Sequence, residues 1–241
     1  MTFSNCHFEL TNIVVLEGAS VKLTGCTFTC NEFSVVFAHA CGTCASVESC
    51  SFIGGFHPVS VVEGASVTVT GSTFNRPQAI AMVVRDKGSL LTAENCRVQG
   101  AEPAAAQSAQ AVPRGALVSM GARLELSSTE IANVRYGVAV CQKSVAVLTS
   151  CHVAAATALT AVVPSGKIAC IRADRNSFVE LSRCVLGAKN KKGADILGVY
   201  AGDSSVKLQE CRVLRSVGGV TLYRSQGVLV DYEFATLGRR R

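Results

Sequence analysis

One interval recurs along almost the whole chain: eight residues separate a turn residue from a small residue, which Phe, Val, Ile or Leu follows two positions later. We name this small residue the anchor. One clear copy runs from Gly18 through Cys26 to Phe28, and another runs from Gly64 through Ser72. The anchors that follow a turn residue in this way are Cys26, Cys50, Ser72, Cys96, Thr129, Cys151, Cys184 and Cys211. A repeat of this kind predicts that the chain folds as an array of similar units.

The turn position favours residues that tolerate a left-handed backbone. The residues found there are Gly18, Gly42, Gly64, Gly88, Gly121, Lys143, Asn176 and Asp203. Glycine adopts the left-handed conformation without a steric cost, and Asn and Asp are the next best residues for it. The spacing offers no explanation for Lys143.

Apolar residues alternate with other residues on both sides of each anchor. They lie five and three positions before it, as at Val21 and Leu23, and again at the anchor and two positions after it, as at Cys26 and Phe28. Such alternation is typical of a strand with one buried face. A third short apolar run precedes the next turn, as at 59–62. Each repeat is therefore predicted to form three short strands.

Three strands in roughly 22 residues, with no helical stretch between them, cannot form an ordinary sheet. They predict a solenoid coil, in which each strand pairs in parallel with its counterpart one coil above and like residues stack in the core. Anchors from Cys6 onward, with a degenerate last one near Glu233, give about ten coils and a rod roughly 48 Å long.

On this periodicity and these stacked positions, the chain resembles the right-handed parallel β-helix repeat family of the pectate-lyase-like solenoid superfamily, over residues 1 to about 237. The resemblance implies the right hand of the coil. Such solenoids include polysaccharide lyases and hydrolases, phage tail proteins and non-catalytic adaptor repeats. We therefore expect an all-β, single-stranded right-handed parallel β-helix that forms one domain over residues 1–241, with a basic tail at 238–241.

The chain has twelve cysteines, and most of them fit the core pattern. Cys6 and six of the later anchors are cysteines, and Ser72 and Thr129 replace cysteine at two anchors, so we predict a buried ladder of small side chains. The remaining cysteines are Cys30, Cys41, Cys44, Cys141 and Cys170. Cys41 and Cys44 have redox or zinc spacing, but no second such pair exists and the histidines are dispersed, so no metal or cofactor is predicted.

Several features favour a reducing, intracellular compartment, cytoplasmic or associated with the cytoskeleton. Met1 leads directly into strand-like residues, so a native start would leave no room for a targeting peptide. The chain has no Asn-x-Ser/Thr acceptor and no apolar run long enough for a membrane span. The many thiols without an evident framework of disulfides agree with this compartment. The alternative that the chain is a piece of a larger protein stays open.

Enzymatic chemistry finds little support in the residues. Glycoside hydrolysis needs two carboxylates at one bond, and the family's hydrolases resemble one another in paired Asp and a Gly-His-Gly motif. The chain has no Gly-His-Gly, and its five aspartates are never adjacent. Asp86 and Asp174 lie near Arg85 and Arg172, where solvated charge is the ordinary interpretation. Trp is absent and Tyr totals four, which is unusual for sugar stacking. No catalytic residue is predicted.

Length variation is confined to the stretch between an anchor and the next turn. The longest insertions run from Ala101 to Arg114, from Ala154 to Lys167 and from Gly187 to Ala194. They should leave the rod along one edge, which is where solenoids place binding loops. Loops are also simply tolerated on surfaces, so the prediction of partner binding here competes with a plain surface role.

Positive charge gives a second indication of binding. The net charge is +6. The candidate binding residues are Lys189, Lys191, Lys192, Arg239, Arg240 and Arg241. They suit an acidic protein surface better than nucleic acid, because no aromatic residues alternate with them.

The first and last coils should expose unpaired strand edges, and neither end of the sequence supplies a helical cap. We therefore expect other protein subunits at these coils and at loops 101–114, 154–167 and 187–194. The resulting hypothesis is a non-catalytic structural or adaptor subunit of a larger intracellular assembly. A carbohydrate-active enzyme, lyase-like or hydrolase-like, or an inactive relative of one, is the alternative.

Overall fold

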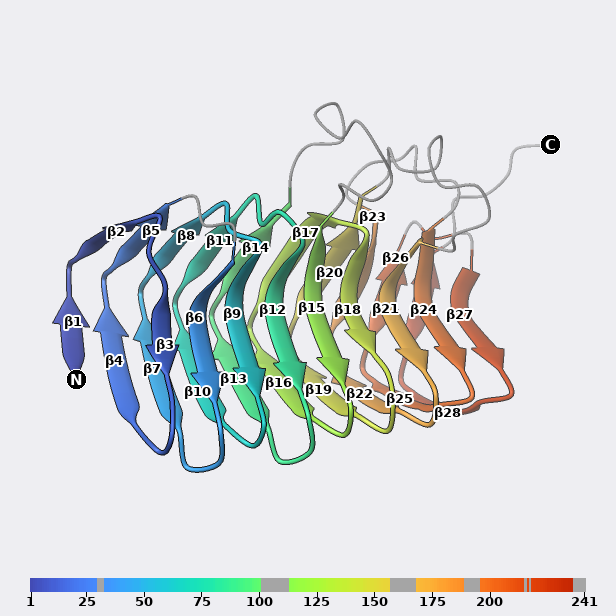
Figure 1. Cartoon of the computed structure of the whole chain (residues 1–241). Coiled ribbons are helices and arrows are strands. Elements are labelled where there is room, and N and C mark those ends of the chain that lie inside the picture. Colours follow the sequence, from blue (N-terminus) through green and yellow to red (C-terminus); the bar gives the residue numbers. More distant parts are fainter. Residues whose placement is uncertain are drawn as a thin grey trace.

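The computed structural model describes residues 1–29, 33–100, 113–156, 168–188, 196–214, 216 and 218–235. Within these residues the chain forms strands and turns and no helix. The strands wind into a three-sided coil, and successive coils stack along the solenoid (Figure 1). The first coil contains β1, β2 and β3, and β27 lies at the opposite end. The predicted all-β parallel solenoid is confirmed.

Three parallel sheets form the sides of the solenoid, with ten, ten and nine strands in the order of the chain. Sheet A contains β1 Thr2–Ser4, β4 Ser20–Thr24, β7 Cys44–Glu48, β10 Ser66–Thr70, β13 Leu90–Glu94, β16 Arg123–Ser127, β19 Val145–Thr149, β22 Phe178–Ser182, β25 Ser205–Gln209 and β28 Gln226–Val230. Sheet B contains β2 His7–Glu9, β5 Thr27–Thr29, β8 Ser51–Ile53, β11 Thr73–Asn75, β14 Arg97–Gln99, β17 Glu130–Val134, β20 His152–Ala155, β23 Val185–Ala188, β26 Arg212–Leu214 and β29 Glu233–Ala235. Sheet C contains β3 Ile13–Val15, β6 Ser34–His39, β9 His57–Val62, β12 Ile80–Arg85, β15 Arg114–Ser119, β18 Tyr136–Val140, β21 Ile168–Asp174, β24 Ile196–Gly202 and β27 Gly218–Tyr223. The prediction of about ten coils agrees with these strand numbers.

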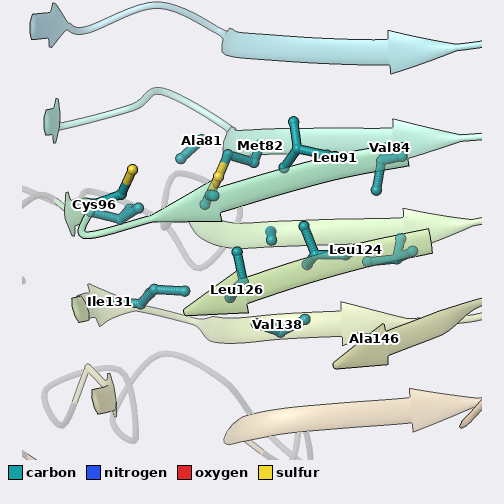
Figure 2. Close-up of a cluster of buried hydrophobic side chains, with 14 of the residues drawn as sticks. Ala81, Met82, Val84, Leu91, Cys96, Leu124, Leu126, Ile131, Val138 and Ala146 are labelled. Atoms are coloured by element: carbon teal, nitrogen blue, oxygen red, sulfur yellow. The ribbon is translucent and has the colours of Figure 1, made fainter. Parts of the chain in front are cut away.

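Inward-facing side chains stack in ladders along the solenoid. The rings of Phe28, Phe52 and Phe74 lie 5.0 and 4.9 Å apart, centroid to centroid, and are nearly parallel. Figure 2 shows the same arrangement in the middle coils, where Leu91 and Leu124 stack inside the coil. Burying each such side chain contributes about 1.5–3 kcal/mol, so the ladders are a principal source of stability.

The anchors form a buried ladder at the corner between sheets A and B, as predicted. Six anchor cysteines and Ser72 and Thr129 are buried, while Cys6 in the first coil is partly exposed. Each anchor donates a hydrogen bond to the carbonyl oxygen two residues earlier, as from Cys96 Sγ to Glu94 at 3.3 Å and from Ser72 Oγ to Thr70 at 3.1 Å. A short donor is thus required there, and a thiol or a hydroxyl satisfies the requirement.

The turn before sheet A has the left-handed backbone that the repeat predicts. Gly121 has a φ of 82°, and Lys143 has a φ of 63°. Lys143 therefore keeps the conformation of the turn in spite of its side chain. The N–H of Gly121 donates to Ser144 Oγ of the next coil at 3.1 Å, and Gly64 donates to Ser89 Oγ at 2.9 Å. These buried hydroxyls join neighbouring turns into a second ladder.

The terminal coils leave inward-facing side chains partly exposed. Phe3 and Phe8 of the first coil pack against the core only in part, and Leu222 and Phe234 of the last coil are 40% and 39% exposed. Among the described residues, no strand pairs with the outer side of either coil. Partner contacts at these coils stay a prediction.

Candidate binding site

The predicted basic residues Lys189, Lys191, Lys192, Arg239, Arg240 and Arg241 lie outside the described residues. The same is true of most of the three predicted loops, at 101–112, 157–167 and 189–194. The strands that flank these segments are described, and each segment joins a strand of sheet B to the following strand of sheet C. The strands that flank all three insertions therefore meet at the corner between sheets B and C, as expected from the spacing.

A cluster of arginines surrounds one tyrosine on the outer face of sheet C, next to this corner. The guanidinium carbons of Arg114, Arg135 and Arg172 lie 5.9, 5.2 and 5.4 Å from the centre of the Tyr136 ring. Arg172 also lies 5.7 Å from the ring of Tyr200. We name Arg114, Arg135, Tyr136, Arg172, Asp174 and Tyr200 the Tyr136 cluster. Its distances are those of cation–π contacts.

Parallel pairing brings these residues together from successive coils. Arg114 begins β15 and Tyr136 begins β18, and these two strands pair. β21 pairs with β18 on one side and with β24 on the other, where Arg172 lies opposite Tyr200. Arg135 lies in the corner just before β18, and its backbone N–H donates to the carbonyl oxygen of Pro113 at 2.8 Å.

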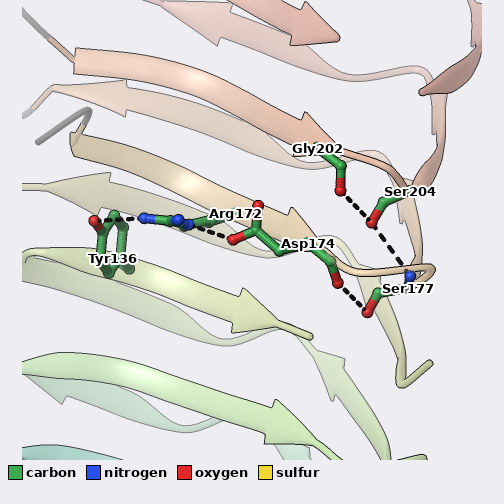
Figure 3. Close-up of polar contacts among 6 residues, drawn as sticks. All are labelled: Tyr136, Arg172, Asp174, Ser177, Gly202 and Ser204. Atoms are coloured by element: carbon green, nitrogen blue, oxygen red, sulfur yellow. Dashed lines mark hydrogen bonds and ion pairs between the residues drawn. The ribbon is translucent and has the colours of Figure 1, made fainter. Parts of the chain in front are cut away.

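The guanidinium group of Arg172 donates hydrogen bonds to two side chains. Its Nη1 donates to the hydroxyl of Tyr136 at 3.0 Å, and its Nε donates to Asp174 Oδ2 at 2.5 Å (Figure 3). Burial alone would disfavour the charged guanidinium, but the hydrogen bond and charge of Asp174 outweigh it and raise the pKa of Arg172 above its ordinary value. The carbonyl oxygen of Asp174 accepts the hydroxyl of Ser177 at 2.7 Å, which fixes this strand end.

Tyr136 faces outward and is nevertheless covered. It is 4% exposed and forms a small apolar cluster with Ala139 and Ala169, separate from the core of the solenoid. Leu117 and Leu197 pack against this cluster and are partly buried. The ring therefore serves as a base on which the guanidinium groups lie, and its face is not open for a ligand to stack on.

Two of the three arginines have no carboxylate partner among the described residues. Elsewhere on the surface arginines pair with acids, as Arg97 does with Glu130 at 3.4 Å and Arg212 with Glu233 at 2.7 Å. Arg114 and Arg135 form no such pair with any described residue, and the Nε of Arg135 is buried without a hydrogen-bond partner. The cluster thus combines three guanidinium groups with one carboxylate, an arrangement that can hold an anion.

The sequence singled out one part of this cluster and missed the rest. The sequence predicts solvated charges at Arg172 and Asp174, but both are partly buried and belong to the Tyr136 cluster. The other expected pair, Arg85 and Asp86, is a looser contact of 3.6 Å. Tyr136 was not singled out at all. The sequence feature that could identify Tyr136 is its position in the repeat, because Arg114 and Tyr136 begin consecutive strands of the third apolar run.

Neither a metal site nor a membrane helix is found in the part of the chain that the structure describes. No group of three or more His, Cys, Asp or Glu side chains is placed there to hold a metal ion. Cys41 and Cys44 are exposed free thiols, Cys41 in the turn before β7 and Cys44 at the start of β7. No described helix is long and apolar enough to cross a membrane.

The fold defines an all-β solenoid of the parallel β-helix class. The family model described as "Right handed beta helix region" matches residues 11–167, and the chain belongs to this family, which confirms the right hand of the coil. No curated protein matches the chain. Among solved structures, the chain is similar to the surface protein and adhesin PfbA of Streptococcus pneumoniae, with a TM-score of 0.43 and 9% sequence identity over 98% of this chain and 84% of that one.

Proposed function

We propose that the chain is a non-catalytic structural or adaptor subunit of a larger intracellular assembly, and that it binds a partner protein through the Tyr136 cluster and the insertions beside it. The observation that carries the proposal is the position of the cluster. Arg114 follows the insertion at 101–112 after one residue, and Ala169, which pairs with Tyr136, follows the insertion at 157–167 after one residue. Cluster and insertions can therefore contact one partner together.

The composition of this face supports a protein partner. Arg and Tyr are enriched at the energetically important centres of protein interfaces, where they are surrounded by apolar contacts. The cluster has such residues at its centre, and Leu117 and Leu197 lie at its border. A face of this kind binds another protein well because the partner can satisfy the charges and cover the leucines at once.

The ends of the rod are the second contact in the proposal. Tyr232 and Phe234 contact each other at a centroid distance of 4.8 Å and are 45% and 39% exposed in the last coil. A subunit that stacks there would bury these rings and pair with the outer strands.

The proposed compartment is intracellular and reducing. All eleven described cysteines are free thiols, and six of the anchors among them are buried one above another. Free thiols in this number are typical of proteins that stay in a reducing environment.

The alternative function is that of a carbohydrate-active enzyme, and the residues of the cluster can be compared with what such an enzyme needs. Hydrolysis requires two carboxylates, and the cluster contains only Asp174, which is bound to Arg172. Sugar rings stack on exposed aromatic faces, whereas the ring of Tyr136 is covered. The residues of the cluster thus favour binding over cleavage.

Affinity purification of the intact chain tests the proposal. We expect a partner protein to co-elute in stoichiometric amount, and we expect R114Q/R135Q to lose most of it. The matched control is R97Q/R212Q, which removes the same charge from arginines that are paired on sheet B. Retention of the partner by R114Q/R135Q would contradict binding at this face. A lone monomer that depolymerises a uronan would favour the enzyme instead.

A further inference from the structure

The Tyr136 cluster contains a buried hydrogen-bond donor that lacks an acceptor among the described residues. Among the described residues, the Nε of Arg135 is buried without a hydrogen-bond partner, and neither Arg135 nor Arg114 has a carboxylate within reach. Buried polar groups are almost always hydrogen-bonded, so an unpartnered guanidinium N–H calls for a specific explanation. An acceptor that arrives with a ligand would supply it.

We propose that the Tyr136 cluster binds a side-chain carboxylate of an acidic peptide segment, held by Arg135 and Arg114. This inference rests on the proposed function and names the chemistry of the partner. A guanidinium group presents its donors in a planar fork that matches the two oxygens of a carboxylate. The Tyr136 ring lies within 5.2 Å of the Arg135 guanidinium and within 5.9 Å of that of Arg114, so both forks are anchored over one base.

The charges of the cluster select a carboxylate over a phosphate. Arg172 is already neutralised by Asp174 at 2.5 Å, which leaves two guanidinium groups for the ligand. A phosphate group carries close to two negative charges at neutral pH and would also meet the charge of Asp174. A carboxylate carries a single negative charge, so Asp174 repels it less than it repels a phosphate.

The surroundings of the cluster select a peptide over a sugar or a nucleic acid. Leu117 and Leu197 border the cluster, and Val83 is another outward-facing apolar residue on β12, in register with Leu117 of β15. An extended peptide places alternate side chains on one face, so an acidic residue can enter the cluster while apolar neighbours contact the leucines. Bases and sugar rings would require an exposed aromatic platform, and Tyr136 does not provide one because it is 4% exposed.

Fluorescence anisotropy with the intact chain tests this site directly. The probes are a labelled peptide that repeats Glu-Ser-Ala-Ser, which places Glu and Ala on the same face when extended, the same peptide with Gln in place of Glu, a phosphotyrosine peptide and an oligouronate. We expect the Glu peptide to bind best, with an affinity that falls as salt rises. We expect R135Q to weaken it by about tenfold, whereas R97Q should leave it nearly unchanged. Tighter binding of the phosphopeptide or the oligouronate, or no effect of R135Q, would overturn the inference.

Two further measurements distinguish a failure of the carboxylate site from a folding defect and from a failure of the proposed function. Urea unfolding of R135Q and R114Q shows whether each variant is folded. If R135Q does not fold, R114Q replaces it in the binding experiment. If R114Q/R135Q loses the co-purified partner but the chain binds no acidic peptide, the proposed function stands and the carboxylate inference fails. If the peptide binds as expected but no partner co-purifies, the carboxylate site stands and the proposed function fails.

Discussion

At the scale of single residues, left-handed backbone recurs at two places in the repeat. One is the turn before sheet A, which the repeat predicts. The other lies immediately before the anchor, where Asn95 and Ser150 have φ values of 53° and 55°. It makes the corner that brings each anchor donor to the carbonyl oxygen two residues earlier, as from Cys151 Sγ to Thr149 at 3.4 Å. The mixture of residues at this second position hides it from the sequence pattern.

Lys143→Gly should stabilise the protein. Lys143 is exposed and has a φ of 63°, a conformation that costs a non-glycine residue about 1 kcal/mol. We expect the free energy of unfolding in urea to rise by about 0.5–1 kcal/mol. Gly121→Ala is the reverse control, because a Cβ there would meet nothing closer than 3.5 Å and only the φ of 82° opposes it. A stabilising effect of Gly121→Ala would contradict this account.

The buried thiols should make stability fall in alkaline solution. Burial raises the pKa of Cys50 and of Cys170 to about 11, from an ordinary value of 9.0. Native thiols therefore keep their protons when unfolded thiols have lost them, so this stability is complete below pH 9 and is lost as the pH rises from 9 to 11. Cys50→Ser fits the anchor position and should lose about 2 kcal/mol less than wild type between pH 8 and pH 10.5 in urea unfolding. Equal losses would argue against the thiol as the cause.

At the scale of elements, each strand is stabilised by the ladder to which its inward residues belong. The phenylalanines of sheet B are the clearest case. Phe52 lies between Phe28 and Phe74 and is fully buried, while Phe8 has a ring on one side in the ladder and is only partly buried. A side chain inside a ladder thus has two neighbours to lose, and a side chain near its end has fewer.

Phe52→Ala should therefore be much more destabilising than Phe8→Ala. Removing a fully buried Phe costs about 3–5 kcal/mol, since the site keeps a cavity that its stacked neighbours cannot fill. Phe8→Ala should cost less than half as much because its ring already contacts solvent. Urea unfolding of the two variants measures the difference. Equal losses would mean that the ladder does not stabilise its middle members more than its end.

The repeat predicts the elements far better than it predicts the candidate site. The constant interval of eight residues predicts the strands of sheet A, the corner at the anchor and the turn before sheet A. It does so because each copy of the interval can be aligned with the next without gaps. Tyr136 and Arg172 are 36 residues apart across an insertion of unpredictable length, so their register could not be counted. The pairing that places them side by side depends on the hydrogen bonds between β18 and β21.

At the scale of the whole molecule, stability depends on nearest neighbours. Each coil pairs only with the coil before it and the coil after it, so a terminal coil has half the partners of a middle one. The last coil reflects this, since the inward residues of β28, Gly227 and Leu229, are exposed and partly buried, whereas those of β16, Leu124 and Leu126, are buried. The ends are consequently where a bound subunit can change local stability most.

Hydrogen exchange of the intact chain should reveal this gradient and its response to a partner. We expect amides of β27 and β28 to exchange faster than those of β13 and β16, because opening an end coil breaks one interface and opening a middle coil breaks two. A partner that stacks on the end should slow exchange in β27 and β28. A partner that binds only the Tyr136 cluster should slow exchange at the starts of β15 and β18 and leave the last coil unchanged. Slow exchange in both terminal coils of a monodisperse monomer would argue against end contacts altogether, since those coils would then be stable without a covering chain.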